Sequence, residues 1–396
     1  MDIRGNEMDK RLIYLDNAAT TRVLPEVVQA MVPYFPELYG NPSAIYDFAG
    51  EAKKAVDGAR TVLAGGIHAK SNEIFFTAGG SESDNWAFKG IAEAYAAKGK
   101  HIITTAIEHQ AVLNTCEYLE RQGFEVSYIG VDQEGRVKLD ELRTAIRPDT
   151  ILISVMAANN EVGTIQPLQE IGELAKSHDC LFHTDAVQAY GHIPLDVDTM
   201  KIDLLSASGH KLHGPKGVGF LYIRKGVKLP SFIHGGAQER GRRAGTLNVP
   251  GIVGFGKAAE LSINHMEEWS RIEQELTKHM IQRVLTEIPD SHLNGSAENR
   301  LPNNASFVFE GIERDSMLIL LDQYGICASG GSACASGSVD DSHVLSAMGI
   351  SHELSRGALR LSLSHETTRE EIDIAVDVLK DTIHRLRSFQ RIDNRL

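Results

Sequence analysis

Long apolar runs are missing from this 396-residue chain. No stretch approaches the ~20 apolar residues that a membrane-spanning helix needs. The polar start, MDIRGNEMDKR, lacks the apolar stretch of a secretory signal peptide. We therefore expect a cytoplasmic protein without membrane contact. Internal repeats and low-complexity segments are also missing, which argues against solenoid and fibrous architectures.

The chain also lacks an excess of positive charge. It carries 40 Lys and Arg against 53 Asp and Glu, a formal net charge of −13. Because nucleic acids bind through neutralisation of their phosphates, we expect no direct nucleic-acid partner. The one basic stretch runs from His384 through Arg385, Arg387 and Arg391 to Arg395. It is either a docking surface for an acidic partner or a solvated helix end.

Cysteine is scarce. The 4 cysteines show no paired CxxC spacing and are too few for a disulfide scaffold, so reduced thiols are expected. Cys116 lies in a helix-like stretch and Cys180 opens an apolar strand, which favours packing roles for both. Cys327 and Cys334 lie close together in a loop of small residues.

Strand-like and helix-like segments alternate along the first two thirds of the chain. Strands are predicted at residues 74–77, 101–104, 125–129, 150–156, 180–185, 202–208 and 217–224, and helices at 84–98, 110–121 and 168–178. This alternation predicts an α/β fold with a large, mostly parallel seven-stranded sheet covered by helices on both faces.

The pattern changes beyond about residue 250. A long amphipathic stretch at 252–285 precedes a strand at 305–309, a helix at 314–323 and a strand at 358–363. These elements predict a smaller α+β domain. We assign residues 20–260 to the large domain, and residues 1–19 with 261–396 to the small one.

The first chemical motif is the glycine turn TAGGSESDN at residues 77–85, between a strand and a helix. Backbone N–H groups at a helix N-terminus would make it a phosphate seat, with the Ser81 hydroxyl added. The alternative is an ordinary glycine turn in which Ser83 or Asp84 caps the helix.

The second motif, HTDAVQ at residues 183–188, ends an apolar strand. The Asp185 carboxylate could keep a heterocyclic nitrogen protonated and so make the ring an electron acceptor. A helix cap or a buried ion pair is the simpler reading of Asp185 alone.

The third motif, SASGHKLHGPKG at residues 206–217, places Lys211 on a glycine-bounded turn after a strand. Such a lysine is a Schiff-base candidate, although most lysines are solvated surface residues. The spacing of His210 and His213 suggests zinc, but no third ligand lies nearby and the turn is not helical, so we expect no metal.

The fourth motif, GICASGGSACASGS at residues 325–338, consists almost entirely of small residues. We interpret it as a mobile loop in which a cysteine is exposed and able to swing. A tight helix-packing segment would have a similar composition. No neighbouring positive charge explains a lowered thiol pKa.

Taken in order, these motifs resemble those of the cysteine desulfurases of the NifS/IscS type. Matching segments run nearly end to end and include 14–21, 40–43, 108–109, 159–163, 240–246 and 360–363. The resemblance implies a pyridoxal 5'-phosphate-dependent transferase fold (fold type I) and, as a rule, a homodimer. It departs from the common pattern at Ser81, where threonine is frequent, and at Cys327, for which packing and sulfur relay both remain open.

The resemblance also implies roles for individual residues. Lys211 would bind the cofactor covalently, Asp185 would pair with its ring nitrogen, Gln188 with its phenolate oxygen, and His109 would stack on the ring. The phosphate would be bound by Gly80, Ser81, Ser208, His210 and, from the other subunit, Thr246. Asn160 would contact cofactor and substrate, Arg360 would bind the substrate carboxylate, and Cys334 would accept the sulfur.

The implied reaction converts L-cysteine to L-alanine and leaves a persulfide on Cys334, with Lys211, helped by His109, moving the proton from Cα. The sulfur would pass to an acceptor protein, such as an iron–sulfur scaffold or a tRNA- or cofactor-thiolation enzyme. Alternatives are another fold type I reaction, such as an aminotransferase or a selenocysteine lyase, and an adaptor that has lost catalysis.

Overall fold

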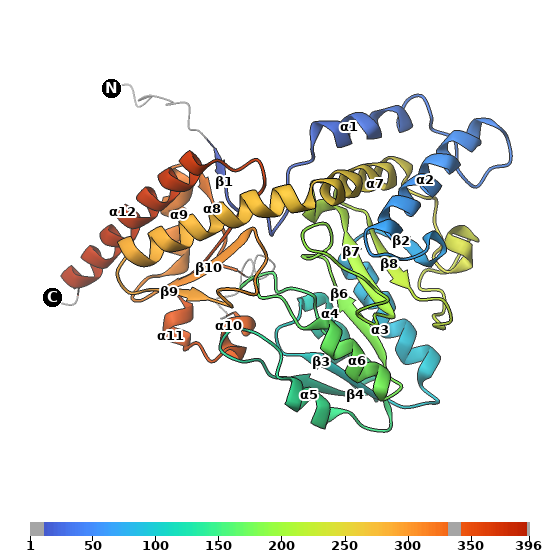
Figure 1. The fold of residues 1–396 in the computed structure, drawn as a ribbon, viewed down its shortest axis with the longest axis horizontal. Coiled ribbons are helices and arrows are strands. Elements are labelled where there is room, and N and C mark those ends of the chain that lie inside the picture. The colour runs from blue at the N-terminus through green and yellow to red at the C-terminus, as the bar shows by residue number, and fades with distance from the viewer. Residues whose placement is uncertain (1–11, 332–341, 394–396) are drawn as a thin grey trace. The chain divides into compact units, whose positions relative to one another are not determined.

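The computed structural model describes residues 12–331 and 342–393, which form two compact units (Figure 1). The larger unit comprises Thr20–Asn160 and Thr164–Met266, and the smaller comprises Met1–Ala19, Glu161–Gly163 and Glu267–Leu396. Within the described ranges, every helix is too short or too polar to cross a membrane.

The larger unit contains a seven-stranded sheet. Its order is β2 (Ile74–Thr77), β8 (Gly219–Ile223), β7 (Leu204–Ser208), β6 (Leu181–Asp185), β5 (Thr150–Ser154), β3 (His101–Thr105) and β4 (Glu125–Ile129). β8 is antiparallel to both neighbours, and the other pairs are parallel. The predicted mostly parallel, seven-stranded sheet is confirmed.

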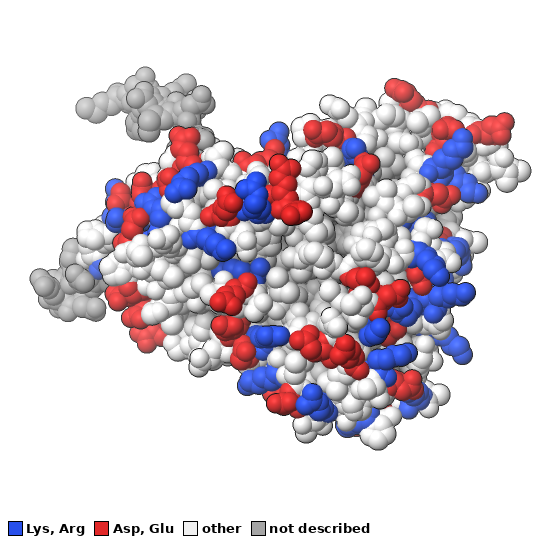
Figure 2. Space-filling view, in the orientation of Figure 1, with Lys and Arg blue, Asp and Glu red and all other residues white. Residues whose placement is uncertain are grey.

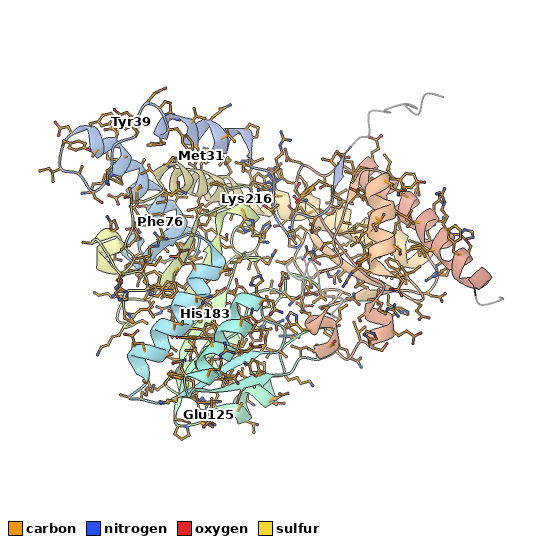
Figure 3. The ribbon with its side chains drawn as sticks, turned by 180° about the vertical axis from the view of Figure 1, so that it is seen from behind. Met31, Tyr39, Phe76, Glu125, His183 and Lys216 are labelled. Carbon is orange, nitrogen blue, oxygen red and sulfur yellow. The ribbon has the colours of Figure 1, made fainter. Side chains whose placement is uncertain are left out.

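Helices cover this sheet on both faces. Figures 1 and 3 show α3 (Gly80–Tyr95) on one face and α6 (Leu168–Ser177) on the other. The remaining helical elements of this unit are α1 (Pro25–Met31), η1 (Val32–Tyr34), α2 (Phe48–Gly65), η2 (Ser71–Glu73), α4 (Gln110–Arg121), α5 (Leu139–Ala145), η3 (Gly209–Lys211), η4 (Gln238–Gly241) and α7 (Val249–Asn264).

Burial explains why the central strands read as continuous apolar runs. All residues of β3, β5, β7 and β8 are buried, as expected for a sheet covered on both sides. Trp86 and Phe88 of α3 pack with Cys116 and Leu119 of α4 against these strands. Cys116 and Cys180 are both buried, so the packing roles predicted for them are confirmed.

The strands that matter for function end at one edge of this sheet. β3, β5, β6 and β7 are parallel, and β2 shares their direction because both β2 and β7 are antiparallel to β8. The loops that follow Thr77, Thr105, Ser154, Asp185 and Ser208 therefore leave from the same edge. This is where ligands bind in open α/β sheets.

The smaller unit has the α+β character predicted for it. Its antiparallel sheet has the order β12 (Ala358–Ser362), β10 (Asn304–Phe309), β9 (Ser291–Asn294), and β1 (Ile13–Tyr14) pairs in parallel with β11 (Ile326–Cys327). Its helices are α8 (Met266–Glu287), α9 (Arg314–Gln323), α10 (His343–Ala347), α11 (His352–Ser355) and α12 (Arg369–Asp393). Phe307, Phe309 and Leu359 lie at the centre of its core.

The amphipathic stretch predicted at 252–285 forms two helices, because His265 leaves the helical conformation and separates α7 from α8. One prediction of local structure is wrong. Cys327 lies in strand β11, not in a loop, because its backbone pairs with Tyr14. Residues 332–338 of that predicted loop, including Cys334, lie outside the described residues.

The basic C-terminal stretch contacts carbonyl groups of its own unit. Arg387 donates to the backbone oxygens of Pro289, Asp290 and Glu310, and Arg385 donates to the Tyr324 hydroxyl at 3.0 Å. On the face drawn in Figure 2, acidic and basic side chains are intermixed. These contacts give Arg385 and Arg387 a structural use within the smaller unit.

Candidate active site

The loop between β2 and α3 leaves backbone N–H groups open to a ligand. Gly79 has φ +154°, a conformation that favours glycine, and is the N-cap of α3 without a side-chain cap. A Cβ on Gly80 would lie 2.6 Å from Val187 Cγ2. Because the first N–H groups of a helix have no intrahelical partner, this glycine turn can receive an anion.

Helix α3 begins before the acidic and hydroxyl residues proposed as alternative caps. Ser83 and Asp84 lie inside the helix and are buried, so the cap reading is wrong for both. Ser208, at the end of β7, is next to the turn: its Oγ would lie 3.7 Å from a Cβ on Gly79. The structure therefore brings Gly80, Ser81 and Ser208 to one place.

Lys211 lies in η3, on a tight turn after β7. The His210 carbonyl accepts from the N–H and the hydroxyl of Thr21, both at 3.0 Å, and the Lys211 carbonyl lies 3.0 Å from His192 Nε2. A Cβ on Gly214 would lie 2.6 Å from the Gly209 oxygen, so the turn needs glycine there. These contacts fix the backbone from which the Lys211 side chain extends.

The carboxyl group of Asp185 is buried at the end of β6. Its Oδ1 accepts from the Val187 N–H at 2.9 Å. Burial raises the pKa of Asp185, while the neighbouring His109 and Lys211 and the Val187 hydrogen bond oppose this rise. Both His109 and Lys211 are therefore close enough to Asp185 to affect its pKa.

His109 is half-buried and caps helix α4. Its Nδ1 accepts from the Ala111 N–H at 3.1 Å, so in the neutral ring the proton is on Nε2. The preceding Glu108 is fully buried and accepts at Oε1 from the Thr105 hydroxyl at 2.7 Å and the Met156 N–H at 3.0 Å. This arrangement sets the direction of the imidazole at the sheet edge.

His210 lies beside the lysine and contacts Thr20. Its Nδ1 is 3.2 Å from the Thr20 hydroxyl. Burial, with the positive charges of Lys211 and Lys216, lowers the pKa of His210 to about 4. His210 is therefore neutral at pH 7 and can act as a hydrogen-bond donor without adding a charge.

Gln188 and Asn160 lie in segments that border Asp185. Gln188 is half-buried three residues beyond Asp185, in the loop whose Val187 packs on Gly80. Asn160 ends the segment after β5, which runs beside β6 because the Ala157 N–H donates to the Asp185 carbonyl at 2.8 Å. Both predicted cofactor-binding residues thus belong to the same edge.

A pocket of about 380 Å³ opens beside Ser81 and His109. Asn85, Lys89, Asn114 and Tyr118 contribute to its lining, and Lys89 Nζ lies 4.7 Å from the centre of the Tyr118 ring. The pocket is lined largely by polar side chains and offers one cationic group, so it suits a small charged molecule next to the site.

Thr246 is exposed in the loop after η4. Arg243 anchors this loop to the turn between β2 and α3, because it donates to Glu82 at 2.8 and 3.1 Å. Glu82 in turn accepts from the Ala78 N–H in that turn. Glu239 fixes the start of the loop through a buried pair with Arg60 at 2.6 Å. The structure brings the Thr246 loop close to α3, and the Thr246 side chain is exposed.

Arg360 belongs to the smaller unit and is almost fully buried in β12. Its Nη2 donates to Asp16 Oδ1 at 2.8 Å and its Nη1 donates to the Gly331 carbonyl at 3.1 Å. The contact between Arg360 and Asp16 was not predicted, because the two residues are separated by 344 positions. No local pattern could have revealed this pair.

Cys334, the predicted sulfur acceptor, lies outside the described residues. Cys327 is half-buried, and burial raises its thiol pKa. Within residues 12–331 and 342–393, His, Cys, Asp and Glu form no group of three that could hold a metal ion.

Comparisons with known proteins agree with this geometry. The family model described as aminotransferase class-V matches residues 13–374. The chain is 56% identical to the cysteine desulfurase IscS of Methanosarcina thermophila, over 96% of this chain and 94% of that protein. It is 52% identical to the cysteine desulfurase IscS of Clostridium botulinum strain Hall, over 95% and 96%. A solved structure of a NifS-like protein has a TM-score of 0.89 and 40% identity, covering 94% of this chain and 99% of that one.

Proposed function

The chain belongs to the aminotransferase class-V family and, within it, to the cysteine desulfurases. We propose that it converts L-cysteine to L-alanine at the site at the sheet edge. In this reaction the sulfur is left as a persulfide on Cys334. The predicted fold and family are confirmed, and the family depends on pyridoxal phosphate. One observation carries the proposal: the Asp185 carboxylate lies within electrostatic reach of both Lys211 and His109.

The residues present fit pyridoxal phosphate. The uncapped N-terminus of α3 and the hydroxyls of Ser81 and Ser208 suit its phosphate, and Gly80 allows the turn to pack against Val187. The buried Asp185 carboxylate suits a protonated ring nitrogen, and Lys211 suits its aldehyde. When bound, the cofactor supplies an electron-accepting ring.

We assign the proton chemistry to three side chains. Lys211 holds the cofactor and afterwards moves the proton from the substrate Cα. Asp185 keeps the ring nitrogen positively charged, because a buried carboxylate favours a partner cation. His109, with its proton on Nε2, covers the ring and assists the transfer. Gln188 and Asn160 complete the polar contacts of cofactor and substrate.

The sulfur step balances with Cys334 as the nucleophile. The Cys334 thiolate attacks the substrate sulfur, an S–S bond forms, and the Cβ–S bond breaks. The electron pair of that bond stays on carbon, which takes up a proton and becomes the methyl group of alanine. The sulfur is oxidised to the persulfide level and the carbon is reduced, so no external oxidant is required.

Two further roles fall to residues of the smaller unit: binding of the substrate carboxylate and delivery of the thiol that accepts the sulfur. Arg360, oriented by Asp16, binds the substrate carboxylate, for which a planar guanidinium is well suited. The segment that contains Cys334 delivers the thiol. We accordingly propose residues 20–260 as the cofactor-binding domain, and residues 1–19 with 261–396 as the domain that carries the catalytic cysteine.

The proposal is tested with the purified holoenzyme. Addition of cysteine should change the visible spectrum and release alanine in the absence of any keto acid, which an aminotransferase cannot do. Lys211→Ala should abolish turnover. Cys334→Ala should retain the cofactor but stop alanine formation, whereas Cys327→Ala, a matched control in the preceding strand, should keep activity.

Two outcomes would overturn the assignment. Wild-type desulfuration by Cys334→Ala would show that another group accepts the sulfur. A colourless protein that cannot be reconstituted with pyridoxal phosphate would instead favour a non-catalytic adaptor.

We propose further that the protein is a homodimer. Its segment 28–48 exposes many large apolar side chains: Val28, Val32, Phe35, Tyr39, Ile45, Tyr46 and Phe48. Figure 3 shows Tyr39 at the outer edge of the larger unit. Exposed apolar surface of this kind marks protein interfaces. A second copy would cover it and bring the partner subunit's Thr246 to the phosphate.

The released sulfur passes from the persulfide to an acceptor. We propose a protein acceptor of the iron–sulfur scaffold or thiolation class, and the cytoplasm as the location, since the three described cysteines are unpaired thiols. Incubation of the persulfide-loaded enzyme with candidate acceptors, followed by mass spectrometry of both proteins, would identify the acceptor.

A further inference from the structure

Three carboxyl groups are buried together below the sheet edge. Asp84 comes from α3, Glu108 from the loop before α4, and Asp185 from the end of β6, and all three are buried. Asp84 and Glu108 are each close enough to Asp185 for its charge to raise their pKa values. Buried like charges at short range cannot all be ionised, so the surroundings decide which group keeps its charge.

Asp185 is the member of this group that lies near the Lys211 ammonium group. Its Oδ1 accepts from the Val187 N–H at 2.9 Å, and this hydrogen bond, with the neighbouring His109 and Lys211, opposes the rise in pKa that burial causes. These contacts favour its carboxylate form.

Asp84 has a different environment. Its nearest basic nitrogen is His183 Nε2, 3.7 Å from Oδ1, which is too far for a hydrogen bond. Both ring nitrogens of His183 are already engaged, Nδ1 with Ser154 Oγ at 2.8 Å and Nε2 with Ser206 Oγ at 3.0 Å. Figure 3 places His183 inside the larger unit, and burial lowers its pKa to about 3. His183 is therefore neutral and gives Asp84 no counter-charge.

The remaining neighbours of Asp84 are the Ser206 hydroxyl and the carboxyl groups of Asp185 and Glu108, and none of them is a cation that would stabilise the Asp84 carboxylate. Among the described residues, Asp84 Oδ1 has no hydrogen-bond partner. The Ser206 hydroxyl lowers the pKa of Asp84, but burial and the charges of Asp185 and Glu108 raise it well above its usual range. Glu108, whose pKa burial raises to about 8, is mainly protonated at neutral pH.

We propose that Asp84 is a neutral carboxylic acid in the folded protein and acts as a positioning residue that leaves Asp185 as the one ionised carboxylate of this group. The charge state of Asp84 follows from the protein's own contacts. Its consequence at the ring nitrogen rests on the proposed function. An uncharged side chain of the same shape should therefore replace Asp84, but not Asp185.

The first test needs neither cofactor nor turnover. Infrared spectra of the apoprotein at pH 7 should contain a protonated-carboxyl C=O band that shifts when aspartate is labelled with ¹³C. The band should persist in Asp185→Asn and disappear in Asp84→Asn. Glu273→Gln is the matched control, because Glu273 is also buried with a raised pKa, yet its band should not respond to aspartate labelling.

The second test measures the pyridoxal phosphate dissociation constant of each variant. Asp185→Asn should weaken binding by about 10–100-fold, the cost expected for losing a hydrogen bond to a charged group. Asp84→Asn should stay within about twofold of the wild type, whereas Asp84→Ala should weaken binding by about tenfold through the lost contacts. Asparagine should preserve cofactor binding at position 84, where the acid is neutral, but not at position 185, where the carboxylate must be charged.

The proposal is overturned if the wild-type apoprotein shows no labelled protonated-carboxyl band, or if Asp84→Asn weakens cofactor binding as much as Asp185→Asn. If Asp84→Asn does not fold, disappearance of the labelled band in Asp84→Ala assigns the band to Asp84, and its persistence there would overturn the proposal. A failure to desulfurate cysteine, with the band present, would count against the proposed function and not against the charge state of Asp84.

Discussion

The contact between Asp16 and Arg360 positions the guanidinium group that we propose as the binder of the substrate carboxylate. Nη2 of Arg360 donates to Asp16 at 2.8 Å, and Arg360 is almost fully buried. Such charge-assisted hydrogen bonds fix the plane of a guanidinium as well as its position. A carboxylate substrate needs that plane to be fixed in advance.

Replacement of Asp16 by asparagine should therefore weaken substrate binding. We expect Asp16→Asn to raise the KM for cysteine by about tenfold with kcat changed less than about twofold, because the contact positions Arg360 and does not touch the reacting atoms. Steady-state alanine formation measures both constants. Asp315→Asn, which removes a surface contact with Arg314 at 3.4 Å, is the control. A fall in kcat at unchanged KM would contradict this role.

The sequence pattern proposed Lys211 and Asp185 near strand ends, and the family resemblance added His109, whereas the long-range partners of these residues could not be predicted. The structure places both Lys211 and His109 near Asp185. The sequence offered Asp84 as a helix cap and placed His183 in a strand. Their burial beside each other depends on how α3 packs on the sheet, which local sequence does not indicate. Asp16 lies 344 positions from Arg360, beyond any local signal.

At the level of elements, the turn before α3 depends on glycine for space. A Cβ at Gly80 would lie 2.6 Å from Val187 Cγ2, so Gly80→Ala should displace the turn or the Asp185–Gln188 loop. We expect this variant to bind pyridoxal phosphate at least about tenfold more weakly, a change of about 1.4 kcal/mol. Equilibrium titration of the apoprotein with the cofactor measures the effect.

Gly58→Ala is the matched control for this substitution. Gly58 lies in the exposed face of α2, and a Cβ there meets nothing within 4 Å. Alanine should stabilise the helix by about 0.5–1 kcal/mol and leave cofactor affinity unchanged. If Gly80→Ala bound the cofactor as tightly as Gly58→Ala, the close approach to Val187 would not be needed for binding.

Helix α8 carries a pH-sensitive group. Glu273 is buried, and burial raises its pKa to about 8, although the His365 N–H opposes the rise. Its ordinary pKa is 4.5, so between about pH 4.5 and 8 the folded state binds a proton that the unfolded state has lost. By linkage, its contribution to stability is present below pH 4.5 and is lost as pH rises through 8.

Glu273→Gln should remove this dependence. Between pH 5 and pH 8 the free energy of unfolding should fall less in the variant than in the wild type, by on the order of a few kcal/mol. Denaturant unfolding at both pH values measures it, and Glu267→Gln, on the exposed face of the same helix, should follow the wild type. Parallel curves for wild type and Glu273→Gln would contradict the raised pKa.

Elements with a clear period were predicted almost residue for residue, among them β2, α4, β4 and α9. Local pattern and length define such elements. The break at His265 escaped prediction because apolar spacing continues through it, while the backbone at His265 leaves the helical region. The short strands β1 and β11 depend on each other over more than 300 residues, so neither segment indicates a strand by itself.

The segment 28–48 carries the exposed apolar surface on which the proposed homodimer rests. Phe35 is 63% and Tyr39 70% exposed in the isolated chain. Leaving so many large apolar side chains in water is unfavourable, at about 25 cal/mol per Å² of apolar surface. A second copy that covers them would offset this cost and complete each phosphate site.

Phe35→Asp should convert the proposed dimer into monomers, because a charge buried in an apolar interface lacks a partner. Sedimentation equilibrium should give a mass near 43.4 kDa for the variant and twice that for the wild type. The monomer should also release pyridoxal phosphate faster, since the partner subunit's Thr246 is withdrawn. Ile319→Asp, at an apolar site 60% exposed on α9, should remain dimeric. Dissociation of both variants, or of neither, would place the interface elsewhere.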